Sequence, residues 1–182
     1  MRLPKVLSEK TKCKTGYLKI ISTNIKLPNK RIVNWNTIVW NHDSVAVVAI
    51  DDKNNIYFSR EWRSAWKKKI TILPAGGVKL NATERERIKQ ARNELREEIG
   101  FDAKKIEKIA TILHAAKIKH KIFIYLATGL FKSPKKSDPE EIIEVVKMPF
   151  KKAYKMFLTG KKETTGYTLL GMTLAKEKLK IK

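Results

Sequence analysis

Residues 74–101 read PAGGVKLNATERERIKQARNELREEIGF, and this stretch decides how the chain is interpreted. The proline and two glycines at its start force a change of direction in the backbone. Thr83 with Glu86 fits a capping box, and Gly100 fits the position just after a helix. The pattern therefore predicts a helix from about residue 83 to residue 99, with a sharp turn leading into it.

Acidic side chains gather on one face of this helix. At about 100° per residue, Glu97 lies at about −60° and Glu98 at about +40° from Glu94, beside an apolar stripe. Like charges at this spacing repel one another, and near a helix C-terminus they also oppose the macrodipole. A divalent cation would remove this cost, and carboxylate oxygens suit Mg²⁺ or Mn²⁺. Helix geometry alone leaves open the alternative of an exposed acidic face paired with nearby lysines.

The stretch from residue 76 to residue 101 resembles the Nudix box, whose pattern is G-x5-E-x7-R-E-U-x-E-E-x-G-U with U a bulky apolar residue. The second half of the pattern matches well at ELREEIGF, residues 94–101. Two further strings resemble the ADP-ribose pyrophosphatase branch of this family. REWR at 60–63 is similar to its RQYR-like strand end, and LPAGG at 73–77 is similar to its LPAG turn. The similarity covers most of the chain from about Tyr17.

The resemblance implies an α/β (α+β) fold, namely a Nudix-type α/β/α sandwich with a mixed β-sheet and a small N-terminal antiparallel β-subdomain. Runs rich in Ile, Val, Thr and Trp at 17–27 and 31–40 predict a hairpin, preceded by a loose basic lead-in over 1–16. We expect residues 1–42 to form this subdomain and residues 43–182 to form the hydrolase domain. The resemblance also implies a homodimer that assembles through the N-terminal subdomain.

The implied activity is Mg²⁺-dependent hydrolysis, with Mn²⁺ as an alternative metal, of the diphosphate in ADP-ribose or a related nucleoside diphosphate sugar. The products would be a nucleoside monophosphate and a sugar phosphate. The resemblance implies that Glu94, Glu98 and the carbonyl of Ala75 hold the metal. Glu97 would be a further ligand or a catalytic group beside the ligands. Such metals neutralise phosphates and activate water for attack on phosphorus.

The remaining implied site residues come from a loop and a strand end. Glu141 and Glu144, around the start of the last predicted strand, are the candidates for a catalytic base, and solvated surface is the alternative for both. Arg60, Trp62 and Arg63 are expected to contact phosphate, ribose or adenine. Arginine supplies forked donors and tryptophan a stacking face. For Trp62 a core strand position is the alternative.

Several positions depart from the family pattern. Asn93 stands where the box has arginine, and Arg85 stands where it has its earlier glutamate. Arg87, at about +20° on the same helical wheel, and Arg92 are the candidates to compensate for the missing positive charge. The segment 115–120 lacks the Ser-Pro-Gly string and the acid of the branch. A weakly active, nucleic-acid-binding Nudix module is therefore an alternative.

Composition bounds these hypotheses. The chain has 182 residues and a net charge of +22, from 40 Lys and Arg against 18 Asp and Glu. Such a surface attracts polyanions, so a Nudix enzyme acting on dinucleoside polyphosphates or RNA 5′ ends is a further hypothesis.

No apolar run approaches the roughly 20 residues of a membrane span, and the first residues lack the apolar part of a secretory signal. The single cysteine, Cys13, excludes an internal disulfide, and we expect a cytoplasmic protein with no membrane partner. The three histidines, His42, His114 and His120, are too dispersed in sequence to predict a metal cluster.

Overall fold

The computed structural model describes residues 2–136 and 142–181. Its strands are β1 (Lys5–Lys14), β2 (Leu18–Lys26), β3 (Ile32–Trp40), β4 (His42–Ile50), β5 (Asn55–Arg63), β6 (Lys68–Ile72), β7 (Ala75–Lys79), β8 (Phe101–Ala115), β9 (Ile118–Lys132) and β10 (Ile143–Pro149). Its helices are α1 (Glu84–Glu94), the π-helix η1 (Leu95–Ile99), α2 (Phe150–Leu158) and α3 (Gly166–Lys178). Within the described residues the ten strands form one mixed sheet along the path β1-β2-β3-β9-β4-β5-β10. β6 joins this path beside β5, β7 beside β4 and β8 beside β9.

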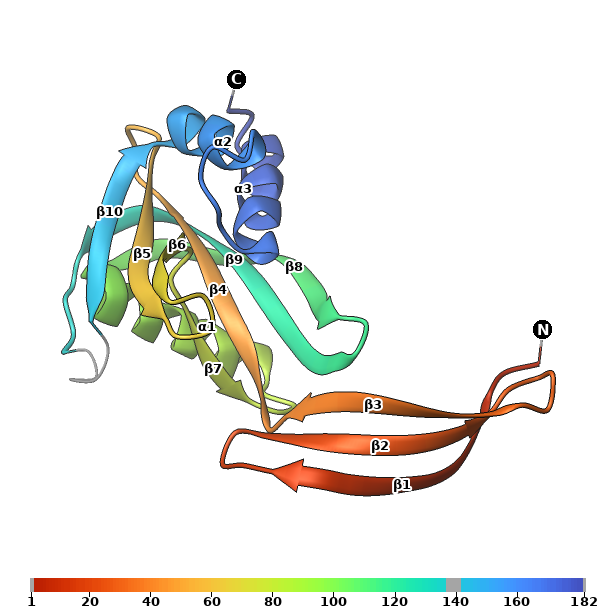
Figure 1. Cartoon of the computed structure of the whole chain (residues 1–182). Coiled ribbons are helices and arrows are strands. Elements are labelled where there is room, and N and C mark those ends of the chain that lie inside the picture. The colour runs from red at the N-terminus through yellow and green to blue at the C-terminus, as the bar shows by residue number, and fades with distance from the viewer. Residues whose placement is uncertain (1, 137–141, 182) are drawn as a thin grey trace.

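The parallel strands β4 and β9 form the buried centre of the sheet. Successive side chains of β4 alternate between two apolar clusters, as side chains of a strand do. Val48 packs in the cluster that contains Phe157 of α2 and Met172 of α3, whereas Val47 packs in the cluster that contains Leu95 of η1. Figure 1 shows α2 and α3 on one face of the sheet and α1 on the other. The expected α/β/α sandwich with a mixed sheet is thus confirmed.

The first three strands form an antiparallel sheet that reaches out from this body (Figure 1). The predicted hairpin corresponds to β2 and β3. The predicted loose lead-in over 1–16 is wrong, because most of it is β1, which pairs with β2 along its length. Every residue of β1 is exposed, so no alternation of apolar and polar residues announces the strand. β3 continues into β9 of the body through the pairs Ile38↔Ile118 and Val39↔Lys119.

The predicted helix over 83–99 forms in two parts. Its capping box is confirmed: the backbone N–H of Glu86 donates to Thr83 Oγ1 at 3.3 Å, and the N–H of Thr83 donates to Glu86 Oε2 at 2.8 Å. From Leu95 the helix continues as the π-turn η1 and ends at Gly100, whose φ of 77° is left-handed. Glycine adopts this conformation at no steric cost. The π-turn is a difference from the prediction, and such turns are frequent at functional sites.

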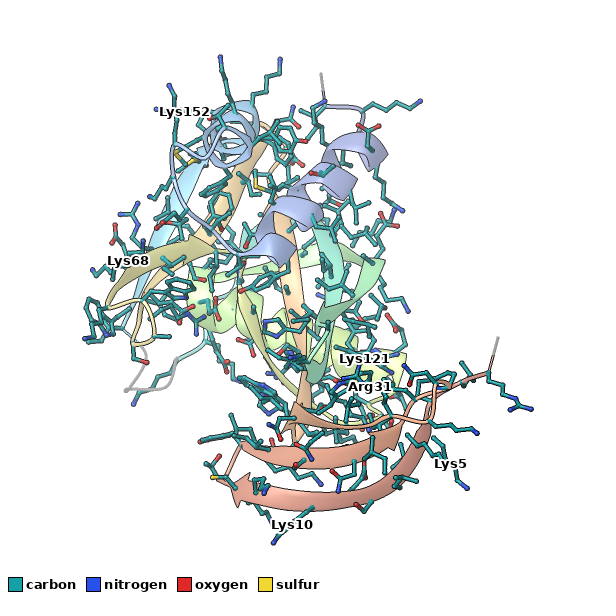
Figure 2. All side chains as sticks on the ribbon, turned by 45° about the vertical axis from the view of Figure 1, so that its right-hand side comes forward. Lys5, Lys10, Arg31, Lys68, Lys121 and Lys152 are labelled. Atoms are coloured by element: carbon teal, nitrogen blue, oxygen red, sulfur yellow. The ribbon has the colours of Figure 1, made fainter. Side chains whose placement is uncertain are left out.

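Basic side chains are spread over both parts of the molecule. Figure 2 labels Lys5 and Lys10 on β1, Arg31 before β3, Lys68 on β6, Lys121 on β9 and Lys152 on α2. All six are exposed, and Figure 2 shows them spread from the N-terminal strands to α2 rather than gathered in one place. Among the described residues, no helix combines the length and the apolar character that a membrane span requires.

Candidate active site

The carboxylate of Glu94 rests against the glycine turn that precedes α1. Glu94 is buried, and a Cβ placed on Gly76 would lie only 1.9 Å from its Oε1. Glycine is therefore required at position 76 by close approach. One helical turn earlier, Gln90 donates from Nε2 to Glu94 Oε1 at 2.5 Å. Two neighbours thus fix this carboxylate, and nothing in the sequence pattern had singled out Gln90.

Glu98 lies one turn further along, on the same side of the helix. It is buried, and its Oε1 accepts a hydrogen bond from the backbone N–H of Ala75 at 3.3 Å. Its Oε2 is buried and has no hydrogen-bond partner among the described residues, and the same holds for the hydroxyl of Ser59 on β5. Burial first, and then the charge of Glu94, raise the pKa of Glu98 well above its usual value, and Glu61 adds to the effect.

This pair of buried carboxylates fits a divalent cation. A hard cation takes oxygen ligands, and it would satisfy the unpaired Oε2 of Glu98 and offset the repulsion from Glu94. Among the described residues, no three His, Cys, Asp or Glu side chains stand close enough to hold a metal ion by themselves. Backbone, water or substrate oxygens would therefore have to complete the coordination, and Ala75 is the nearest backbone candidate.

Glu97 points elsewhere. Its Oε1 forms an ion pair with Lys135, in the segment that follows β9, and about a quarter of its side chain is exposed (24%). The helical wheel placed all three acids within about 100° of one another. In the structure Glu94 and Glu98 come together, while Glu97 faces the loop. The π-turn contributes to this difference, because it rotates the chain by a smaller angle per residue than an α-helix does.

The strand end at 60–63 separates the residues that were predicted to bind substrate. Arg63 reaches the cleft beside the carboxylates, where its Nη2 lies 2.6 Å from Glu61 Oε1. Trp62 is 58% exposed and does not line the cleft. Arg60 donates to Thr71 Oγ1 at 3.2 Å and to Glu144 Oε1 at 3.1 Å. Alternation along β5 places Arg60 and Trp62 on the face opposite to Glu61 and Arg63.

Of the two predicted catalytic bases, the structure describes only Glu144. Glu144 lies on β10 directly opposite Arg60, and its carboxylate is paired with Arg60 and, at 3.7 Å, with Lys69. Glu141 lies outside the described residues. The position of a catalytic base therefore stays a prediction.

A cleft of about 880 Å³ opens beside the glycine turn. Its walls include Ala75, Gly76, Arg63 and three aromatic residues, Trp40, Trp66 and Tyr167. Burial raises the pKa of Tyr167 to about 12, so its phenol remains a donor at neutral pH. Trp66 is 68% exposed, in the turn between β5 and β6. An exposed tryptophan in a turn is the one signal that could have marked this wall in advance.

The arginines predicted to compensate for Asn93 do not do so. Arg87 donates to Glu84 and to the carbonyl of Ala82, and its guanidinium lies 4.3 Å from the ring centre of Phe123. Arg92 is paired with Asp102 and donates to the carbonyl of Ala103 at 2.8 Å. Both side chains serve the packing of the helix on the sheet. The prediction failed because the wheel gives direction around the helix axis but not position along it.

The three histidines lie closer together than their spacing along the chain indicates. Residues 42, 114 and 120 are far apart in sequence, but their rings lie side by side where β4, β8 and β9 meet: the His114 and His120 ring centres are 5.2 Å apart, and those of His42 and His120 are 5.9 Å apart. Strand pairing brings them together, which spacing along the chain could not reveal. His114 and His120 line the same cleft.

Known proteins resemble this chain in sequence and in fold. No protein-family model matches it. It is 30% identical over 137 residues to the ADP-ribose pyrophosphatase of Bacillus subtilis (strain 168), covering 73% of this chain and 71% of that protein. It is 28% identical over 139 residues to the methanol dehydrogenase activator of Bacillus methanolicus, covering 75% and 73%. It is 33% identical over 107 residues to the ADP-ribose pyrophosphatase of Mycobacterium tuberculosis (strain ATCC 25618 / H37Rv), covering 58% and 50%.

A solved structure described as an ADP compounds hydrolase shares the fold. It superposes with a TM-score of 0.86 at 20% sequence identity and covers 99% of this chain and 96% of that one. At this identity the likeness concerns the fold. The extended N-terminal sheet belongs to the shared architecture, because almost the whole of both chains is covered.

Proposed function

Since this chain belongs to the Nudix hydrolases related to the ADP-ribose pyrophosphatases, we propose that it cleaves the diphosphate of ADP-ribose or a related nucleoside diphosphate sugar with the help of Mg²⁺. The observation that carries the proposal is the buried pair Glu94 and Glu98 against the turn at Ala75 and Gly76, at the wall of a cleft. The names of two relatives support the substrate class. Mn²⁺ would substitute for Mg²⁺, because both take oxygen ligands.

Each residue of the carboxylate site has a role in this proposal. Glu94 and Glu98 would hold the metal together with the carbonyl of Ala75, and Gln90 would keep Glu94 in its orientation. When bound, the metal supplies neutralisation of the diphosphate and a water of lowered pKa. Glu97 would leave its ion pair with Lys135 and act as a further metal ligand, or it would orient the attacking water. In-line attack on phosphorus would release a nucleoside monophosphate and a sugar phosphate.

Contacts to the substrate are proposed along the cleft. Arg63 would bind a phosphate through its forked donors, while Arg60 and Trp62 would need a rearrangement of the strand end or a partner subunit to take part. For the base, Glu144 would act only after its ion pair with Arg60 opens, so Glu141 is the stronger candidate.

A homodimer is part of the proposal. β1, β2 and β3 carry a face on which Val6, Ile25 and Val33 are paired across the three strands, with Trp35 49% exposed beside them. A second copy would cover this face, and the subdomain of residues 1–42 would then serve assembly while residues 43–182 serve catalysis. A sedimentation mass near 21.0 kDa at micromolar concentration would contradict the dimer. The free thiol of Cys13 is compatible with the reducing cytoplasm, which we propose as the location.

Hydrolysis of dinucleoside polyphosphates or RNA 5′ ends is the second candidate function, and a weakly active module that binds nucleic acid is a third. The net charge of +22 supports both. The lysines that provide it are dispersed (Figure 2), which favours general attraction of anions over a built nucleic-acid groove. Binding of RNA with a steep dependence on salt would favour these alternatives.

A substrate panel tests the proposal. ADP-ribose, other nucleotide sugars, dinucleoside polyphosphates and 5′-triphosphate RNA would be compared with and without Mg²⁺. We expect fastest turnover of a nucleoside diphosphate sugar, only with metal, and loss of turnover in Glu98→Gln. Glu177→Gln is the matched control, because Glu177 is exposed on α3, far along the chain from the carboxylate pair. Unchanged turnover in Glu98→Gln would overturn the metal assignment.

A further inference from the structure

A chain of hydrogen bonds crosses the wall of the cleft opposite Arg63. The hydroxyl of Ser44 on β4 lies 3.0 Å from His120 Nε2, and the other ring nitrogen of His120, Nδ1, lies 3.0 Å from His114 Nδ1. Trp40 stacks on His120, with ring centres 5.1 Å apart and planes 30° apart. All four side chains line the cleft that contains Ala75 and Gly76.

The hydrogen bonds that link Ser44, His120 and His114 can run in two directions, which differ in which atom of each pair is the donor. In one, the Ser44 hydroxyl donates to His120 Nε2, and His120 Nδ1–H donates to His114 Nδ1, which leaves His114 Nε2 protonated. In the other, every bond is reversed, and His114 Nε2 becomes an acceptor. A neutral imidazole has one donor and one acceptor nitrogen, so the two arrangements are the only ones that satisfy both bonds with neutral rings. His114 is exposed, and its Nε2 is the end of the chain that a ligand can meet.

The buried histidine of this wall, His120, is uncharged at neutral pH. Burial, and then the neighbouring rings of His114 and His42, lower the pKa of His120 to about 4, although Asp43 opposes the shift. His42 bonds to Asn41 Oδ1 at 2.9 Å, and Asp43 accepts from the backbone N–H of Lys121. A single imidazole nitrogen beside an indole face suits a hydroxyl group and the C–H face of a sugar, whereas a phosphate would favour the forked donors of Arg63 and the metal.

We propose that His114, oriented through His120 and Ser44, binds a sugar hydroxyl of the substrate, with Trp40 as the apolar platform beside it. This inference rests on the proposed function, since it assigns the sugar end of a nucleoside diphosphate sugar to this wall. It gives the cleft two ends of different chemistry, with the diphosphate at the carboxylates and the hydroxyl-bearing group at the histidines. It also gives a role to the segment around 115–120, where the sequence departs from the family pattern.

Kinetics with two variants test the proposal. One lost hydrogen bond to a ligand corresponds to about tenfold in affinity, so His114→Ala should raise KM for ADP-ribose about tenfold with kcat nearly unchanged. His114→Asn, which keeps a donor and an acceptor, should recover part of the loss. Ser44→Ala should raise KM by a smaller factor, about two- to threefold, because Ser44 affects His114 only by setting the direction of the hydrogen bonds through His120. Glu177→Gln serves again as the matched control, since Glu177 is exposed on α3 and does not line the cleft.

Binding of ADP, which lacks the second sugar, separates this inference from the proposed function. We expect His114→Ala to leave the affinity for ADP within twofold of the wild type. The chain has three histidines, so NMR can follow each ring, and ADP-ribose but not ADP should shift the His114 and His120 ring resonances. If the wild type hydrolyses ADP-ribose and His114→Ala does so with unchanged KM, the hydroxyl site is refuted and the proposed function stands. If the wild type does not hydrolyse any nucleotide sugar, the proposed function fails, and absent ring shifts with ribose 5-phosphate would refute the hydroxyl site as well.

Discussion

Replacing Gly76 by alanine should disable the carboxylate site without unfolding the protein. A Cβ at this position would lie 1.9 Å from Glu94 Oε1, whereas ordinary contact begins at 3.4 Å. The Glu94 carboxylate must therefore retreat by about 1.5 Å. Because a misplacement of about 1 Å can cost about 100-fold in rate, we expect kcat/KM to fall at least about 100-fold and Mg²⁺ affinity to fall with it. The backbone itself permits alanine, since Gly76 does not have a positive φ.

The assay pairs turnover with a metal titration that does not depend on turnover, such as the Mg²⁺-induced shift in Tm. Gly16→Ala is the matched control, because no heavy atom lies within 4 Å of a Cβ there. Glu94→Asp shortens the side chain by one methylene and relieves the contact, so the double variant should be no worse than Glu94→Asp alone. A Gly76→Ala protein with wild-type turnover and wild-type metal affinity would refute the argument that close approach fixes Glu94.

Three further predictions concern stability. In metal-free buffer at pH 7, Glu98→Gln should raise Tm, because it removes a carboxylate whose pKa is raised by burial and by Glu94, and it should abolish the gain in Tm on adding Mg²⁺. Between pH 6.5 and pH 4 the unfolded chain binds more protons at His120 than the folded chain does. The free energy of unfolding should therefore decrease by up to about 3 kcal/mol as the pH is lowered through this range. His120→Asn should make the free energy of unfolding, measured by urea titration, depend less on pH. Thr83→Ala should cost about 1 kcal/mol through loss of the capping box, and an unchanged urea midpoint would contradict the cap.

The elements that could be predicted from the sequence are those that depend on residues close together in the chain. The capping box at Thr83 and the glycine at position 100 depend on residues close together in the chain, and both form as predicted. β1 escaped prediction because every one of its residues is exposed, and the backbone hydrogen bonds that pair it with β2 leave no alternating pattern in the side chains.

The site was predictable in part for a related reason. Glu94 and Glu98 lie one turn apart, so helix geometry brings them together, and the adjoining glycine turn is read from the same stretch. The approach of Arg63 and Tyr167, the pairing of Arg60 with Glu144, and the meeting of the three histidines all depend on which strands are neighbours. That information is set by the register of the sheet and is absent from any single segment.

The chain as a whole carries a large positive charge, whereas the candidate metal site is a buried pair of acidic residues. Attraction of an anion to the surface and its binding at the site are therefore separate steps. A surface of +22 raises the local concentration of every anion, nucleotide or nucleic acid alike. At the turn of Ala75 and Gly76, however, the buried carboxylates of Glu94 and Glu98 would repel an anion unless a cation lay between them. We therefore expect salt to slow the capture of substrate without changing which substrate is cleaved, and removal of the metal to abolish binding of a diphosphate. If raising the salt concentration altered the ranking of nucleotide sugars, the surface lysines would have to be part of the specificity site, and this separation would be wrong.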